Sequence, residues 1–317
     1  MRLFEHADFR AICIDAARRF NLPEQFIEKD YYVTEALRIA ANKLGGHLVF
    51  KGGTSLSKGW HLLERFSEDL DLFLNPASYD PPLARRRIDR ELKELRDAVA
   101  SHPGLTFDQD SSRTIGGFGR DDVFRYESSF DEILAIPTTV KFEAGIQSGA
   151  FPVETVMISS FAAERLRERG LSNIAEDLEP FPMTLLHFRR TFVEKLFTVH
   201  GKVERLKSEG ERLRRGARHY ADLYVLAGRA EVLAMIESSE YGQIRTDYNE
   251  KSLVFFRNSY RPPEDLRFNK SDAILLPGNL RAMVEEDYYA DVRLLFRDGP
   301  PPFDAVIGRL QSLAAKL

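Results

Sequence analysis

The sequence predicts an α+β protein with an N-terminal domain built on a mixed sheet and a mainly helical second domain. Up to about residue 155, short apolar runs that end in glycine or proline alternate with charged, helix-like segments, which is typical of strands and helices sharing one core. Beyond that point apolar residues recur at helical spacing, most clearly in 185–206 and 219–236. We therefore expect domains at residues 1–155 and 156–317.

The first 44 residues predict two helices. Pro23 stands near the start of the second helix, and Gly45 and Gly46 follow its end. Residues 47–53 then predict a short buried strand that ends at a pair of glycines.

The remaining elements of the N-terminal domain continue this alternation. Residues 54–66 predict a short helix with a possible break at Gly59, and residues 68–74 predict a strand. Residues 81–104 predict a charged surface helix that begins at proline and closes at a Pro-Gly pair. Three strand-like runs follow, at 105–109, 122–130 and 137–145.

Composition limits the classes of protein that fit. With 317 residues, 43% of them hydrophobic, the chain can bury a core for two domains. The net charge of −4 means that a nucleic-acid contact would need a local basic patch. The single cysteine, Cys13, excludes an internal disulfide and a cysteine zinc cluster, which fits a reducing compartment. We find no secretory leader and no apolar run of membrane length, so we expect a cytoplasmic protein without membrane contact.

Residues 51–74, KGGTSLSKGWHLLERFSEDLDLFL, carry an acidic pair inside an apolar run. On a strand, alternate side chains share a face, so Asp69 and Asp71 point the same way. Two adjacent carboxylates repel each other unless a cation lies between them, and oxygen ligands favour Mg²⁺ or Mn²⁺. We predict that Asp69 and Asp71 are ligands of a metal that takes part in phosphoryl chemistry.

A glycine turn precedes this pair by one helix. Gly52 and Gly53 have no Cβ, so a phosphate can approach the backbone closely, and a helix N-terminus offers free N–H groups. Thr54 and Ser55 add hydroxyl donors, and Lys58 adds positive charge. An isolated Gly-Gly pair is usually only a turn, and an isolated Asp-x-Asp is usually an exposed strand edge. The two patterns together predict a site that binds a triphosphate. The pattern is neither a P-loop nor a dinucleotide fingerprint, because both spacings are absent.

These residues resemble the nucleotidyltransferase superfamily with the polymerase-β-like core, whose signature is a glycine turn, a helix and an acidic pair on the next strand. The chain is more closely similar to the AbiEii toxin family of type IV toxin–antitoxin systems. The stretches that carry this resemblance span most of the chain, with a looser match at the extreme C-terminus. They are IEKDYYVTEAL, FKGGTSLSKGWHLLERFSEDLDL, VKFEAG, TFVEKLFTVHGK and RHYADLYVL.

The resemblance implies roles for residues of both domains. Gly53 and Ser55 would hold the triphosphate of an NTP, and the acidic pair would bind the metal. Lys195 and Asp222 would act on the nucleotide from the helical domain. Many relatives have aspartate where this chain has His219, which leaves open whether Asp222 alone performs that role.

Several candidates have two interpretations. The resemblance makes Glu143 a candidate general base, whereas the alternative is a salt-bridged strand residue. If its strand pairs with the acidic strand, Glu143 and Lys141 share the face of the acidic pair. Arg65 either clamps a phosphate or pairs with a nearby carboxylate. If the family resemblance is set aside, Lys195 is expected to be a surface lysine of a helix, and Asp222 is expected to be one member of an i,i+4 ion pair.

Residues 189–218 form a basic segment, with ten Lys or Arg against four Glu, a balance of +6. Such a surface attracts phosphate backbones, although a solvated helical hairpin of mixed charge is the alternative. The close spacing of Arg212, Arg214 and Arg215 favours RNA as the molecule that this segment binds. The resemblance adds the 3′ end of tRNA as an acceptor, and the sequence leaves a protein hydroxyl open.

We therefore predict a metal-dependent nucleotidyltransferase toxin that transfers NMP from an NTP to an acceptor, with tRNA favoured and a cognate antitoxin as partner. The alternatives are a nucleotide-binding interaction protein without catalysis, and transfer to a protein or small-molecule hydroxyl. Intact Gly53, Asp69 and Asp71 argue against lost catalysis. The basic segment argues against a cationic drug as acceptor. Which NTP is used stays open.

Overall fold

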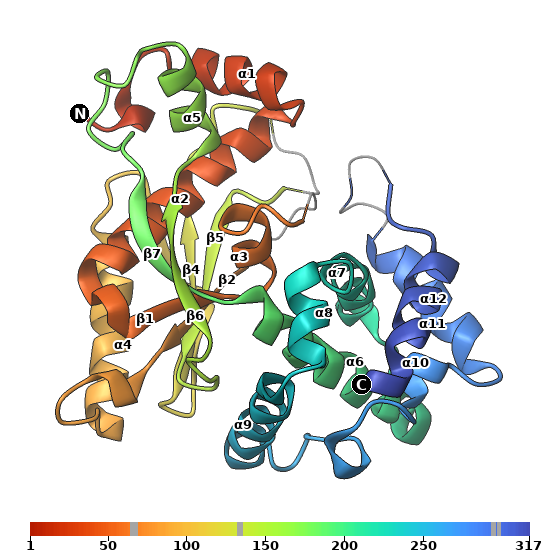
Figure 1. The fold of residues 1–317 in the computed structure, drawn as a ribbon. Helices are drawn as coiled ribbons and strands as arrows, with labels where there is room; N and C mark the ends of the chain where they lie inside the picture. Colours follow the sequence, from red (N-terminus) through yellow and green to blue (C-terminus); the bar gives the residue numbers. More distant parts are fainter. Residues whose placement is uncertain (64–68, 132–135, 293–295, 297–298) are drawn as a thin grey trace. The chain divides into compact units, whose positions relative to one another are not determined.

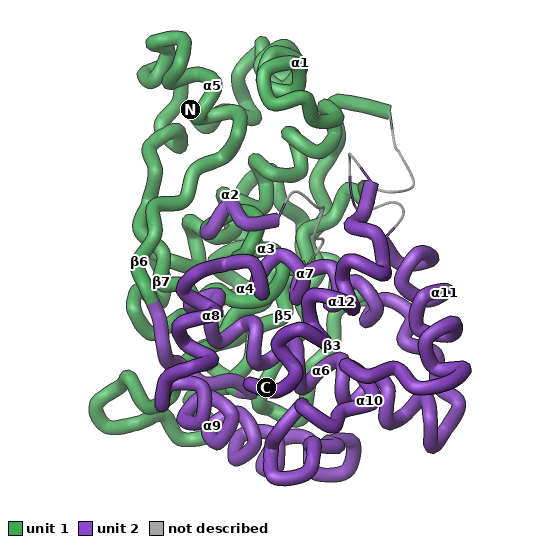
Figure 2. The backbone as a smooth tube through the Cα atoms, turned by 45° about the vertical axis from the view of Figure 1, so that its right-hand side comes forward, with its two compact units in different colours: residues 1–59, 68–146, 154–185 green, residues 60–67, 147–153, 186–317 purple. Residues whose placement is uncertain are grey.

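The structure is a computed structural model that divides into two compact units (Figure 2). The described residues are 1–63, 69–131, 136–292, 296 and 299–317. Unit 1 comprises residues 1–59, 68–146 and 154–185, and unit 2 comprises residues 60–67, 147–153 and 186–317. Residues 156–185 thus group with the first unit, whereas the sequence suggested a boundary at 155. The division of the chain into functional domains at that position stays a prediction.

The described part of unit 1 is built on a seven-stranded sheet in the order β3-β4-β5-β2-β1-β7-β6 (Figure 1). β2 pairs antiparallel with β1 and parallel with β5, and β1 pairs parallel with β7. The predicted α+β class with a mixed sheet is confirmed. The strands are β1 (Leu48–Lys51), β2 (Asp69–Leu74), β3 (Thr106–Ile115), β4 (Gly119–Arg125), β5 (Thr139–Gly145), β6 (Val153–Ile158) and β7 (Phe181–Leu186).

Helices pack against this sheet. α2 contacts β1 and β5 as well as its neighbouring helices, and α4 contacts β4. α4 forms because its apolar side chains recur every three or four residues and are all buried. The helices of unit 1 are α1 (Phe9–Phe20), α2 (Glu24–Leu44), α3 (Gly52–Lys58), α4 (Arg85–Ala100) and α5 (Phe161–Glu168).

Two strands, β6 and β7, lie where the sequence predicted mostly helix. β7 runs almost directly into a long helix, so its apolar residues merge with a helical pattern. Pairing decides its conformation, because Leu185 lies beside Phe50 of β1 and both side chains are fully buried. The helix predicted at 54–66 is shorter and ends at Lys58, next to Gly59, where the sequence suggested a possible break. Residues 64–68 lie outside the described part of the chain.

Unit 2 is helical, as predicted for the C-terminal half. The long helix α6 packs against α7, α8, α9 and α10, and α7 packs against α11 and α12. α6 ends where Gly210 adopts a left-handed conformation. No helix among the described residues has the length and apolar composition of a membrane span. The helices are α6 (Phe188–Glu209), α7 (Arg218–Leu226), α8 (Ala230–Ile236), α9 (Ser239–Phe255), α10 (Asp272–Leu275), α11 (Leu280–Val292) and α12 (Phe303–Leu313).

Candidate active site

A row of charged side chains crosses four strands of the sheet. Asp71 on β2 is the cross-strand partner of Lys51 on β1 and of Glu143 on β5. Glu143 is in turn the partner of Asp121 on β4. Directly opposed residues face the same side of a sheet, so all four share one face. The register therefore places Glu143 beside the acidic pair, as the sequence suggested, and adds Asp121, which sequence reasoning missed.

The second member of the acidic pair, Asp69, is the cross-strand partner of Lys141. The Lys141 ammonium is hydrogen-bonded to the Glu143 carboxylate and lies 3.4 Å from Asp69 Oδ1. The Lys51 ammonium lies 3.9 Å from Asp71 Oδ1. Although partial burial lowers the pKa of Lys141, its hydrogen bond to Glu143 and the nearby carboxylates raise it overall. Lysines thus balance the carboxylates of this face.

The donor set suits a hard divalent cation. Asp69, Asp71 and Glu143 offer only carboxylate oxygens, the ligands that Mg²⁺ and Mn²⁺ prefer. Burial raises the pKa of Glu143, and the charges of Asp71 and Asp69 add to this effect. A cation on this face would relieve that repulsion. Within the described ranges no three His, Cys, Asp or Glu side chains already converge as a metal cluster, and Lys141 contacts both Asp69 and Glu143. The residues fit a metal, and the ligand assignment stays a prediction.

The glycine turn lies directly against the acidic strand. Gly52 has a φ of +77°, and a Cβ at this position would lie 1.9 Å from Asp71 Oδ2. Both the backbone conformation and the available space therefore require glycine. Thr54 Oγ1 donates to the Asp69 carbonyl at 2.5 Å, and Ser55 Oγ donates to the Gly52 carbonyl at 2.9 Å. The Thr54 bond joins the turn to β2, and the Ser55 bond lies within α3. Phosphate binding by Thr54 and Ser55 stays a prediction.

The remaining candidates of unit 1 are Gly53, Lys58 and Arg65. Gly53 lies in the first turn of α3, and Lys58 ends that helix. The Lys58 ammonium donates to Asp30 Oδ1 at 2.5 Å and to the Ser159 carbonyl at 3.1 Å, and its side chain is only 6% exposed. A phosphate would have to compete with this ion pair. Sequence reasoning did not single out Asp30, although it lies in IEKDYYVTEAL. Arg65 lies outside the described residues.

In unit 2, Lys195 on α6 and Asp222 on α7 form a buried ion pair. Lys195 Nζ donates to Asp222 Oδ2 at 2.7 Å, and the two side chains are 7% and 0% exposed. The same Nζ lies 3.1 Å from His219 Nδ1. Burial, followed by the Lys195 charge, lowers the pKa of His219 to about 3. A neutral imidazole can accept a hydrogen bond from the ammonium at Nδ1. Sequence reasoning named His219 only as a departure from the family pattern and did not pair it with Lys195, because Lys195 lies 24 positions away on another helix.

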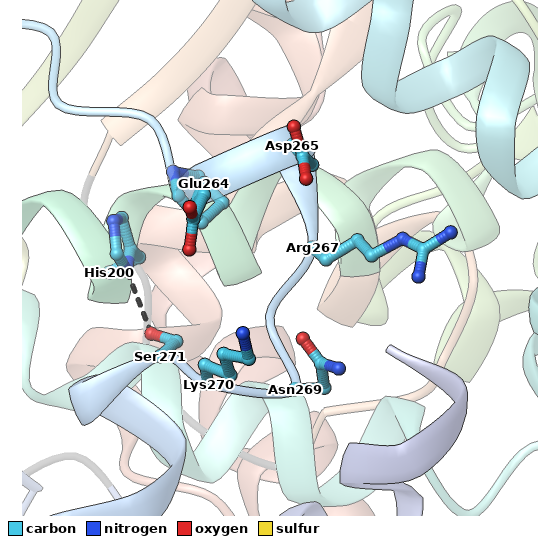
Figure 3. Close-up of a pocket in the computed structure, with 8 residues that line it drawn as sticks. His200, Glu264, Asp265, Arg267, Asn269, Lys270 and Ser271 are labelled. Carbon is cyan, nitrogen blue, oxygen red and sulfur yellow. Dashed lines mark hydrogen bonds between the residues drawn. The ribbon is translucent and has the colours of Figure 1, made fainter.

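A separate pocket of about 220 Å³ lies in unit 2 (Figure 3). His200 Nδ1 and Ser271 Oγ lie 2.7 Å apart in its wall. Acidic and basic side chains both surround the pocket, so its charge selects no class of ligand. None of the predicted site residues contributes to it. Its lining is His200, Pro263, Glu264, Asp265, Arg267, Asn269, Lys270 and Ser271.

A glycine turn, a short helix and carboxylates aligned across a mixed sheet are the arrangement that the sequence predicted for a nucleotidyltransferase. Comparison with protein families matches residues 36–309 to the nucleotidyl transferase AbiEii toxins of type IV toxin–antitoxin systems. The chain belongs to this family, which confirms the resemblance and implies an NTP substrate and an antitoxin partner.

The fold is also similar to a solved structure. MenT4, a nucleotidyltransferase toxin from Mycobacterium tuberculosis H37Rv, matches with a TM-score of 0.56 at 20% sequence identity. The match covers 99% of this chain and 87% of that chain. At this identity the likeness is one of fold. A search of curated proteins found no match.

Proposed function

We propose that this nucleotidyltransferase is metal-dependent and transfers NMP from an NTP to RNA, with the 3′ end of tRNA as the acceptor. The observation that carries the chemistry is the strand register, in which Asp71 lies beside Glu143 and Asp69 beside Lys141. Three carboxylates on one face form an oxygen-only donor set that suits a divalent cation, which would take the place of their contacts with Lys51 and Lys141. The glycine turn supports the proposal, because the absence of a Cβ at Gly52 lets the start of α3 lie directly against the Asp71 carboxylate.

The roles of the sheet residues follow from their chemistry. Asp69 and Asp71 would hold Mg²⁺ or Mn²⁺, which when bound polarises a phosphoryl group and stabilises its developing charge. Glu143, whose pKa is raised by burial, would accept the proton of the acceptor hydroxyl. The hydroxyl oxygen forms a bond to the α-phosphorus, the bond from that phosphorus to the β-phosphate oxygen breaks, and pyrophosphate leaves.

Lys195 would neutralise negative charge on the triphosphate, a role in which a point charge suffices. Asp222 would hold the ammonium in place through their 2.7 Å hydrogen bond. His219 would add a second, neutral acceptor at 3.1 Å. These assignments extend the family resemblance with contacts that lie wholly within unit 2.

The function is tested by following a label. The protein is incubated with each α-³²P-labelled NTP, Mg²⁺, and total RNA or total protein from the same cells. We expect label in the RNA pool, at the 3′ end of tRNA, with one or more NTPs. Label in the protein pool alone would instead identify a protein hydroxyl as the acceptor, and label in neither pool with any NTP would contradict the proposed transfer.

The contribution of Lys195 is tested with a double variant. Replacing Lys195 alone would leave Asp222 buried without the ammonium that neutralises it, at a cost of about 3–5 kcal/mol. Lys195→Met combined with Asp222→Asn removes both charges and keeps their approximate volume. We expect transfer to fall by about 100-fold or more, with thermal unfolding little changed. Lys251→Gln on the exposed surface of α9 is the control, and full activity of the double variant would refute the role.

A further inference from the structure

Five of the ten cations of the basic segment form ion pairs of 3.2 Å or shorter within unit 2. Arg212, which in the sequence favoured RNA, forms ion pairs of 2.8–2.9 Å with two acids of α11. The number of arginines in this part of the sequence therefore overstates the positive charge that is available to bind RNA. The ion pairs are Arg189–Glu240, Arg190–Glu194, Arg190–Asp247, Lys195–Asp222, Lys207–Glu204, Lys207–Asp272, Arg212–Glu286 and Arg212–Asp287.

Three other cations of the segment form what we call the α6–α7 cation cluster: Lys202, Arg205 and Arg218. The Lys202 side chain packs across Gly216, where a Cβ would lie 2.2 Å from its Cδ and Cε. Burial and the like charges of Arg205 and Arg218 lower the pKa of Lys202 overall, although the charges of Glu211 and Asp291 act in the opposite direction. Two acids lie near the cluster: the Glu211 carboxylate lies 4.0 Å from Arg205, and Asp291 Oδ2 accepts a hydrogen bond from the Arg218 backbone N–H at 2.7 Å. Three cations thus share two nearby acids, which leaves a surplus of positive charge.

The cluster also contains unsatisfied donors. The Nε atoms of Arg205 and Arg218 are buried, and neither has a hydrogen-bond partner in the described part of the chain. No ion pair to Lys202 or Arg218 occurs among those residues. Leaving a charged donor unsatisfied is costly, and phosphate oxygens satisfy guanidinium groups with strong, charge-assisted bonds. The chemistry of the cluster therefore suits a phosphate ligand.

The position of the cluster suggests more than one phosphate. Lys202 follows Lys195 by seven residues on α6, so the two lie on one face and about 10 Å apart along the helix. Arg218 begins α7 and precedes His219, which contacts Lys195. The cations thus continue along the same two helices as the Lys195–Asp222 pair. A line of positive charge suits the backbone of a polyanion better than a single phosphate.

We infer that Lys202, Arg205 and Arg218 bind the phosphate backbone of the RNA acceptor near Lys195. This inference rests on the proposed function and names the residues of unit 2 that bind its acceptor. Among acceptor classes, RNA is favoured because a row of three cations, with two acids nearby, matches repeating phosphates rather than the hydroxyl of a folded protein.

The test measures tRNA binding as a function of salt. Lys202→Gln combined with Arg218→Gln removes two charges without breaking an ion pair, and Lys251→Gln is the matched control. Deacylated total tRNA is titrated at several salt concentrations. We expect the double variant to bind about tenfold more weakly or worse, with the slope of log K against log salt reduced by about 1.4–1.8. Binding of NTP and thermal unfolding should match the wild type.

The outcomes separate this inference from the proposed function. If tRNA is labelled by the wild type but the double variant binds it with the same affinity and slope, the cluster assignment is wrong and the function stands. If label enters protein and the wild type shows no salt-dependent binding of tRNA, both are wrong. Weakened NTP binding with unchanged tRNA binding would assign the cluster to the nucleotide and overturn the inference.

Discussion

At the scale of single residues, Asp71 connects the parts of the candidate site in unit 1. Its carboxylate lies over Gly52, pairs across strands with Glu143, and lies 3.9 Å from the Lys51 ammonium. Its charge also contributes to the raised pKa of Glu143. Removing that charge should therefore affect chemistry and stability in opposite directions.

We predict that Asp71→Asn lowers nucleotide transfer by about 100-fold or more, because several kcal/mol of charge stabilisation by a bound metal would be lost. Stability should hold or rise, since repulsion with Glu143 is relieved. Transfer assays and thermal unfolding check both parts. Asp110→Asn, at an exposed position of β3, is the control. Wild-type transfer by Asp71→Asn would show that the metal assignment is wrong.

A second residue-scale prediction concerns pH. Burial lowers the pKa of His102 from 6.5 to about 4, and its buried Nε2 has no hydrogen-bond partner among the described residues. The unfolded chain therefore binds a proton below about pH 6.5 that the folded chain binds only near pH 4. The contribution of His102 to stability falls as the pH falls through this window, by roughly 1.4 kcal/mol per unit.

His102→Gln should accordingly make stability less sensitive to acid. We expect the difference in melting temperature between pH 7.5 and pH 5 to be smaller in the variant than in the wild type. Comparing each protein with itself removes any constant cost of the substitution. Identical pH dependence of the two proteins would show that His102 is not neutral in the folded state at pH 5.

At the scale of elements, the turn from β1 into α3 depends on a glycine that nothing else can replace. We predict that Gly52→Ala costs about 1–3 kcal/mol of stability, because φ is positive and the new Cβ would meet Asp71. Transfer should fall too, since the Asp71 carboxylate must move. Gly46→Ala is the matched control, because φ there is not left-handed and no atom lies within 4 Å of its added Cβ. Equal melting temperatures of Gly52→Ala and wild type would contradict the argument.

At the scale of the whole molecule, membership of the AbiEii toxin family predicts growth inhibition. We expect the protein to slow growth when it is produced without its antitoxin, and co-production of the cognate antitoxin to restore growth. Asp71→Asn should be harmless at the same protein level, because toxicity follows from transfer. Growth curves with measured protein levels check this. An active wild-type protein that accumulates without slowing growth would count against it.

Net charge illustrates why whole-molecule quantities say little about sites. The chain carries −4 overall and +6 over residues 189–218, yet five of the ten cations there form ion pairs of 3.2 Å or shorter. What remains to attract RNA is a small set on α6 and α7. Neither the net charge of the chain nor that of the segment could have identified these cations, because ion pairing depends on which acidic side chains the fold brings close to them.

By itself the sequence determined the fold class, the glycine turn and the alignment of Asp69 with Asp71. These features follow from periods of two and 3.6 residues and from the chemistry of neighbouring residues, all of which are local. The sequence offered Glu143 only as a candidate. It indicated which face of its strand Glu143 occupies but not which strand lies next to it.

Only the tertiary structure decided the contacts between distant residues. Strand β7 depends on pairing with β1, the Lys58 ammonium is held by Asp30 on α2, and His219 joins Lys195 across two helices. Each of these is a long-range contact whose formation depends on packing of the whole core. A single sequence shows directly which residues prefer a helix, a strand or a turn. Which distant residues come into contact depends on burial, strand register and charge balance over the whole fold.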